Sequence, residues 1–315
     1  MTENTTKILL PRNVNSHVLD FLIDVTSDSY RQDKNAFHNI VLDLSQINYI
    51  EIEGVLSLIC VCAAIKRKNP NTNFRIIYPK ERVLTYLMTL GFFGQMTNKV
   101  EILEGQEIIH IENKWRKERK TMQIARAKRS DPGPVVLPIE TINQRMQSTT
   151  IFDFENMVGK FANNAMETLD ILRTSALYNF SGEDYYRFRQ SNIELYKNVF
   201  HHSRSWGIAS IHARPDVGTT VCYYDIGIGF KESVKRFNTE AESIEWALVD
   251  GNTSKLEEDN DGYGFTLIQE FVFQRKGSIK IRSGDCLLQL NSNTSREKKK
   301  VKKFPGVQIS YLIPA

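Results

Sequence analysis

The pattern of apolar residues changes about a third of the way along this 315-residue chain, and the change restricts the folds that it can adopt. Up to residue 105, short aliphatic runs such as 38–44 alternate with longer amphipathic stretches such as 52–67. Repeated strand–helix units of this length predict an α/β sheet with helices packed on it. From residue 135 onward, two helical patterns, 152–177 and 185–204, precede most of the predicted strands. This order predicts an α+β two-layer sandwich.

The stretch between the two patterns, 106–134, has weak periodicity and contains Pro132, Gly133 and Pro134. Such residues interrupt helices and strands, so a connector is expected here. The chain is therefore predicted to hold two domains, 1–105 and 135–315, which is also the number that its length favours.

Basic residues are concentrated in two segments, although the formal net charge is only +4. Segment 114–129 has a local charge of +7 and segment 296–303 (REKKKVKK) one of +5, which leaves −8 for the remaining chain. Such segments can bind nucleic acid or acidic partners. A solvated connector and a solvated hairpin loop are the simpler explanation, so nucleic acid is not the favoured partner.

The composition, 41% hydrophobic and 25% charged residues, is typical of a globular protein. The N-terminus is polar, and the longest apolar stretch, 54–65, is shorter than the roughly 20 residues needed to span a bilayer. The four cysteines show no CxxC or metal-ligand spacing. We therefore expect a cytoplasmic protein with buried, reduced cysteines and no membrane segment.

Several fixed points in the first domain carry a resemblance to a family. The run 40–45 (IVLDLS), the run 50–54 (IEIEG), the helical stretch that follows it and the closing 90–92 (LGF) resemble a STAS domain, the fold of bacterial anti-sigma-factor antagonists. Such antagonists usually carry Asp-Ser-Ser-Gly, with a phosphorylatable serine, where this chain has Glu51-Ile-Glu-Gly54. A constitutive docking module without a phosphorylation switch is therefore expected.

The predicted helix 185–204 carries the first candidate site. Glu194, Asn198 and His202 are spaced four residues apart, so they share one helix face. A carboxylate one turn from a carboxamide suits a site where the amide oxygen binds Mg²⁺ and the carboxylate polarises a nucleophile. The same spacing also occurs on ordinary polar helix faces.

Two glycine-containing segments follow. A predicted strand delivers Asp225, and Gly227 and Gly229 then allow the backbone to approach a ligand closely, or simply form a tight turn. Further on, Gly262 and Gly264 open a predicted helix, where free backbone N–H groups can bind phosphate.

The order of these segments resembles that of the GHKL ATPases, which include gyrase, histidine kinases, MutL and heat-shock chaperones. Glu-xxx-Asn is followed by Asp-x-Gly-x-Gly 27 residues after the Asn and then by Gly-x-Gly, and the resemblance covers about 135–315. It implies that ATP binds between a sheet and a helical layer. It also implies that Asn198 holds Mg²⁺, that Glu194 is a general base and that Asp225 binds the adenine amino group.

The same resemblance assigns roles to the glycines and to the loop between them. Gly227 and Gly229 would let the base pack closely, and Gly262 and Gly264 would meet the phosphates. The polar segment 230–261 would form a lid over the nucleotide.

These expectations describe a Mg-ATP-binding regulator whose lid is ordered by ATP and alters binding to a protein partner or to a second copy. A serine kinase of the anti-sigma type acting on a separate STAS protein, and a non-catalytic nucleotide- or nucleic-acid-binding scaffold, are the alternatives. A self-phosphorylating histidine kinase is disfavoured, because His110 is the only histidine between residues 39 and 200. The roles of His201 and His202 stay open.

Overall fold

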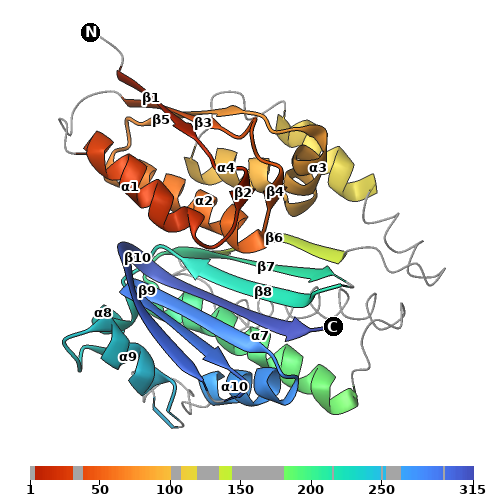
Figure 1. Ribbon diagram of the computed structural model, residues 1–315, viewed down its shortest axis with the longest axis vertical. Coiled ribbons are helices and arrows are strands. Elements are labelled where there is room, and N and C mark those ends of the chain that lie inside the picture. Colours follow the sequence, from red (N-terminus) through yellow and green to blue (C-terminus); the bar gives the residue numbers. More distant parts are fainter. Residues whose placement is uncertain are drawn as a thin grey trace. The chain divides into compact units, whose positions relative to one another are not determined.

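The computed structural model describes residues 4–30, 38–100, 108–118, 135–143, 181–214, 216–249, 251–252, 264–293 and 295–315 (Figure 1). The chain divides into two compact units, Met1–Met122 and Gln123–Ala315. The first contains a parallel sheet and the second an antiparallel sheet, which confirms a mixed α and β chain. Within the described residues, no helix is long and apolar enough to cross a membrane. The predicted helix 152–177 lies outside the described residues.

The first unit is built on a three-stranded parallel sheet in the order β1-β3-β5. Alternate residues of these strands, such as Ile8, Leu42 and Phe74, are buried, and helices cover that face of the sheet (Figure 1). The strands are β1 Asn4–Leu9, β3 His38–Asp43 and β5 Asn73–Ile77, with a short parallel pair formed by β2 Asn13–Val14 and β4 Tyr49–Ile50. The helices are α1 Val18–Tyr30, α2 Ile52–Lys68, α3 Glu81–Leu90 and α4 Phe92–Val100.

Residues 108–118, which fall within the predicted connector, form a helix that packs in the first unit. Glu112 on this helix is 1% exposed, and its two carboxylate oxygens accept hydrogen bonds from the backbone N–H groups of Phe93 at 2.9 Å and Gly94 at 2.7 Å. These donors belong to the first turn of α4, where N–H groups have no partner within the helix. Trp115 adds a hydrogen bond from Nε1 to Thr89 Oγ1 at 3.2 Å. The sequence of this segment is polar and does not indicate that the helix docks, because the contacts that hold it are made with residues distant in the sequence.

Burial raises the pKa of Glu112 to about 7, against the two backbone N–H bonds and the charge of Arg116, which lower it. The folded state therefore binds more protons than the unfolded chain between about pH 4.5 and pH 7. The contribution of Glu112 to stability is greatest below this range and falls as the pH rises through it.

We expect the free energy of unfolding of the first unit to fall, relative to that of Glu112→Gln, by about 3 kcal/mol between pH 4.5 and pH 7. Urea unfolding followed by Trp115 fluorescence, with Trp206 and Trp246 replaced by Phe, measures this difference. The variant does not titrate and is the control. A difference that is independent of pH would contradict the assignment.

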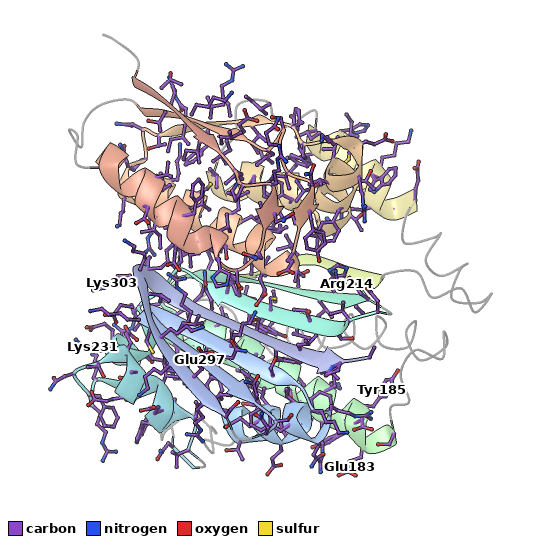
Figure 2. All side chains as sticks on the ribbon, viewed as in Figure 1. Glu183, Tyr185, Arg214, Lys231, Glu297 and Lys303 are labelled. Carbon is purple, nitrogen blue, oxygen red and sulfur yellow. The ribbon has the colours of Figure 1, made fainter. Side chains whose placement is uncertain are left out.

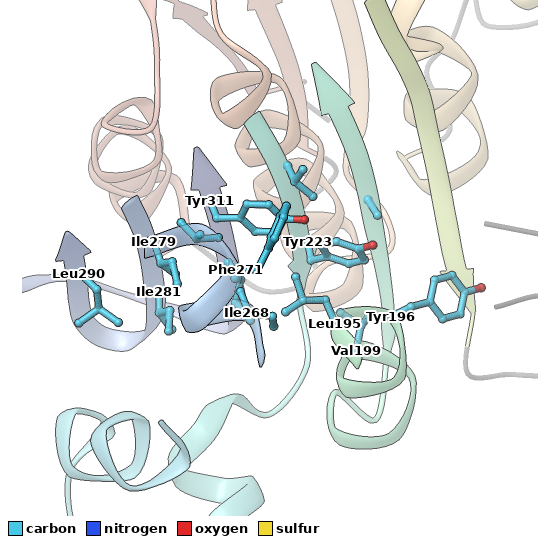
Figure 3. Close-up of a cluster of buried hydrophobic side chains, with 14 of the residues drawn as sticks. Leu195, Tyr196, Val199, Tyr223, Ile268, Phe271, Ile279, Ile281, Leu290 and Tyr311 are labelled. Atoms are coloured by element: carbon cyan, nitrogen blue, oxygen red, sulfur yellow. The ribbon is translucent and has the colours of Figure 1, made fainter. Parts of the chain in front are cut away.

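The second unit contains a five-stranded antiparallel sheet in the order β6-β7-β8-β10-β9. Its strands are β6 Val135–Asn143, β7 Trp206–Arg214, β8 Gly218–Asp225, β9 Ser278–Asn291 and β10 Arg296–Pro314. Helices α7 Gly182–His202 and α10 Gly264–Gln274 cover one face, and the shorter α8 Gly229–Val234 and α9 Glu240–Ala247 lie between β8 and α10 in sequence. The apolar core between the sheet and α7 and α10 includes Leu195, Ile268, Phe271, Tyr223 and Tyr311 (Figure 3).

The basic segment 296–303, for which the sequence predicts a solvated hairpin loop, belongs to strand β10 instead. Its residues from Arg296 to Lys300 pair with Leu290 to Cys286 of β9, because backbone pairing does not depend on side-chain charge. Its lysines stay exposed, and Figure 2 labels Glu297 and Lys303 on this part of β10. Two of its lysines form surface ion pairs, Lys298 with Glu245 and Lys299 with Glu297.

Candidate functional site

The predicted site segments converge on one cavity of the second unit. It has about 810 Å³ of empty space, part of which is open solvent at its mouth. Among the predicted residues, Glu194, Asn198, Asp225, Gly229 and Gly264 line it. They come from α7, β8, α8 and α10, so the fold brings together segments that are up to 70 residues apart.

Two of the predicted glycines, Gly227 and Gly262, are not among the described residues that line the cavity. Gly227 is described but is not among the residues that line the cavity. Gly262 lies outside the described residues.

Helix α7 presents Glu194, Asn198 and His202 to the cavity on successive turns, as their spacing predicts. The helix begins at a capping box, in which Ser181 Oγ accepts from the Asp184 N–H at 3.2 Å and Asp184 Oδ2 accepts from the Ser181 N–H at 2.7 Å. A fixed start sets the position of every later turn of the helix.

A buried hydrogen-bond network sets the rotation of α7 over the sheet. The Tyr223 hydroxyl on β8 donates to Asn192 Oδ1 at 2.9 Å, and Asn192 Nδ2 lies 3.2 Å from the Tyr311 hydroxyl on β10. Burial raises the pKa of both tyrosine hydroxyls, so both stay protonated. Asn192 and Glu194 are about 200° apart around the helix, so fixing Asn192 toward the sheet also fixes the direction in which Glu194 points.

His201 and His202, to which the sequence assigns no definite role, have different surroundings in the structure. The imidazole Nδ1 of His202 lies 3.1 Å from the Ser233 hydroxyl on α8, and both residues line the cavity. The ring of His201 packs edge-on against Phe200 at a centroid distance of 5.2 Å and is not part of the lining. His202 therefore links α7 to α8, whereas His201 does not face the site.

Asp225 ends strand β8 at the floor of the cavity. It is 3% exposed, and its Oδ1 accepts from the Gly227 N–H at 2.7 Å. The following backbone turns back on the end of α7, where the Ile228 N–H donates to the carbonyl of Ser203 at 3.1 Å. A Cβ at Gly227 would lie 1.9 Å from that carbonyl oxygen. The glycine is thus required by a contact within the protein, a cause that the motif alone does not reveal.

We expect Gly227→Ala to lower the free energy of unfolding by about 1–3 kcal/mol, because the methyl group would force the turn away from Ser203. Thermal unfolding followed by circular dichroism measures this loss. The control is Gly182→Ala, because a Cβ at Gly182 would meet nothing within 4 Å. Gly251→Ala is not suitable, because the backbone of Gly251 has a φ of +76°, which strains other residues. Equal stability of Gly227→Ala and the wild type would refute the assignment.

A second anchor holds α8 and α9 to the sheet. The Ser283 hydroxyl on β9 donates to Glu240 Oε2 at 2.7 Å and accepts from the Phe230 N–H at 3.0 Å. The same Glu240 oxygen accepts from the Lys231 N–H at 3.1 Å. The sequence predicts a lid at 230–261 and assigns no role to Glu240 or Ser283. Only the Thr-x-x-Glu pattern that begins α9 marks this region in the sequence.

The walls of the cavity are mainly apolar, and its charges are acidic. Phe230, Trp246 and Phe265 supply aromatic rings, and Glu194 and Asp225 supply carboxylates. Among the described residues that line it, none is a lysine or an arginine. An apolar cavity that is also lined by two carboxylates and a carboxamide suits a flat heterocycle that carries a polar, metal-binding group.

Asn198 and Glu194 are the groups that could hold a metal ion here. Within the described residues, no group of three or more His, Cys, Asp or Glu side chains could form a protein-only metal site. Mg²⁺ usually binds through one or two protein oxygens, with water and phosphate completing its octahedron. The amide oxygen of Asn198 in an open cavity fits that mode of binding.

A scan against protein-family models found no matching family, and a search of curated proteins found no similar protein.

Proposed function

We propose that the second unit binds ATP with Mg²⁺ in this cavity and that the protein is a nucleotide-dependent regulator. The observation that carries the proposal is the convergence of Glu194, Asn198, Asp225, Gly229 and Gly264 on one cavity. The resemblance to GHKL ATPases selected these residues from three separate segments. An antiparallel sheet covered on one face by α7 and α10 also agrees with that resemblance.

The apolar walls of the cavity favour the adenine ring, and its acidic side chains favour the metal ion. The carboxylate of Asp225 would accept a hydrogen bond from the adenine amino group, with aromatic side chains packed around the ring. The phosphates would lie toward Asn198 and Gly264, where α10 begins and its first N–H groups are free of helical partners. Bound Mg²⁺ would neutralise phosphate charge.

Glu194 would act as the general base. Its carboxylate would take a proton from an attacking water or from a serine hydroxyl of a partner, and the terminal phosphoryl group would pass to that oxygen as ADP leaves. Hydrolysis and serine phosphorylation need the same groups, so the serine kinase remains the second candidate function.

We also propose that the first unit is a STAS-like docking module. A parallel sheet covered by helices, with α2 beginning directly after β4, supports this assignment. Glu53 at the start of α2 is buried and no hydroxyl side chain occurs at 51–54, which supports docking without a phosphorylation switch.

Asp225→Asn should weaken ATP binding by about 1.5–3 kcal/mol, because an amide replaces a charged acceptor at the adenine amino group. Isothermal titration calorimetry with ATP and Mg²⁺ measures the loss. Asp216→Asn, in the exposed turn after β7, is the matched control and should bind as the wild type does. Equal affinity of Asp225→Asn and wild type would remove Asp225 from the adenine site.

Glu194→Gln should lower the rate of phosphate release, or of phosphate transfer to a serine-containing partner, by about 100-fold or more. ATP binding should not weaken, because the amide keeps the size of the side chain and removes a negative charge. Glu183→Gln, on the exposed first turn of the same helix, is the control. An unchanged rate in Glu194→Gln would exclude it as the base.

A further inference from the structure

The charge of the cavity conflicts with a strongly anionic ligand. Glu194 and Asp225 line it, and none of its described lining residues is a lysine or an arginine. Like charges held close together in a partly desolvated site repel one another strongly. If the proposed function is correct, a basic side chain beyond the described lining residues would add to the charge that Mg²⁺ supplies to the phosphates.

Lys197 does not line the cavity, but its ammonium group forms an ion pair with Glu194, the proposed base, which does. Its Nζ lies 3.2 Å from Glu194 Oε1, one turn along α7. The side chain of Lys197 is 37% exposed and that of Glu194 is 21% exposed. Ion pairs with this much contact with water are weak, and the long lysine side chain can change partner without moving the helix.

The second oxygen of Glu194 faces the expected position of the phosphates. A Cβ at Gly264 would lie 3.2 Å from Glu194 Oε2, so the carboxylate adjoins the first residue of α10. A phosphate bound at the start of α10 would be a neighbour of this carboxylate. The other oxygen of the same carboxylate, Oε1, is the one that holds Lys197.

We propose that Lys197 exchanges partners when a nucleoside triphosphate binds, moving its ammonium group from Glu194 to the phosphate oxygens. This inference rests on the proposed function and assigns a positioning role to Lys197. The exchange neutralises phosphate charge and frees the Glu194 carboxylate from its cation only when phosphates are present. A ligand without phosphates leaves the ion pair intact, so the site distinguishes ATP from its nucleoside.

The test compares two ligands in three proteins. ATP with Mg²⁺ and adenosine are titrated calorimetrically into wild type, Lys197→Met and Lys197→Arg. We expect Lys197→Met to weaken ATP binding about tenfold or more, the effect of losing one charge-assisted hydrogen bond, and to leave adenosine affinity unchanged. Lys197→Arg should recover most of the ATP affinity. Lys299→Met, on the exposed part of β10, is the control for loss of one positive charge.

Glu194→Gln supplies an independent measurement. It removes both the competing partner of Lys197 and a like charge near the phosphates, so it should tighten ATP binding and leave adenosine binding unchanged. In the Glu194→Gln background, Lys197→Met should still weaken ATP binding. If the ion pair had only a structural role, Glu194→Gln and Lys197→Met would instead change the ATP affinity in the same direction.

The possible outcomes separate this inference from the proposed function. If wild type binds ATP and Lys197→Met binds it equally well, the exchange is refuted and the ATP site stands. If Lys197→Met loses ATP and adenosine affinity to the same extent, the lysine supports only the structure and the exchange is again refuted. If wild type binds neither ligand, the proposed function fails and the exchange fails with it.

Discussion

The hydrogen bonds between Asn192, Tyr223 and Tyr311 determine how the second unit presents its chemistry. A buried amide that lost these partners would leave unsatisfied polar atoms in the core, which is costly. The network therefore permits one rotation of α7 over the sheet. That rotation places Glu194 and Asn198 at the cavity, which Asp225 also lines. The site thus depends on a polar contact in the middle of an apolar core.

The backbone around the cavity is fixed by contacts within the protein on two sides. The turn after Asp225 packs on the carbonyl of Ser203, and Glu240 with Ser283 holds the starts of α8 and α9 against β9. The proposed lid is therefore anchored at its beginning.

In the first unit, a buried polar contact likewise holds a helix in place, the helix 108–118. Glu112 accepts hydrogen bonds from two of the free N–H groups of α4, and the contact buries its carboxylate away from water. A group held in this way titrates near neutral pH, so the docking of this helix depends on solution conditions. Unlike the apolar core of the unit, this contact joins a segment that the sequence assigns to a connector.

The sequence by itself determined the mixed α and β architecture, the strand 38–44, the helix 52–67 and the four-residue spacing of Glu194, Asn198 and His202, because periodicity and helix geometry are local properties. The tertiary structure decided what depends on distant partners. It placed 296–303 in β10 by pairing with β9, docked Glu112 on α4, and explained Gly227 by Ser203. It also paired Glu194 with Lys197 beside Gly264. Close approach between separate segments leaves no periodic signal in a single sequence, which is why these contacts could not be predicted from it.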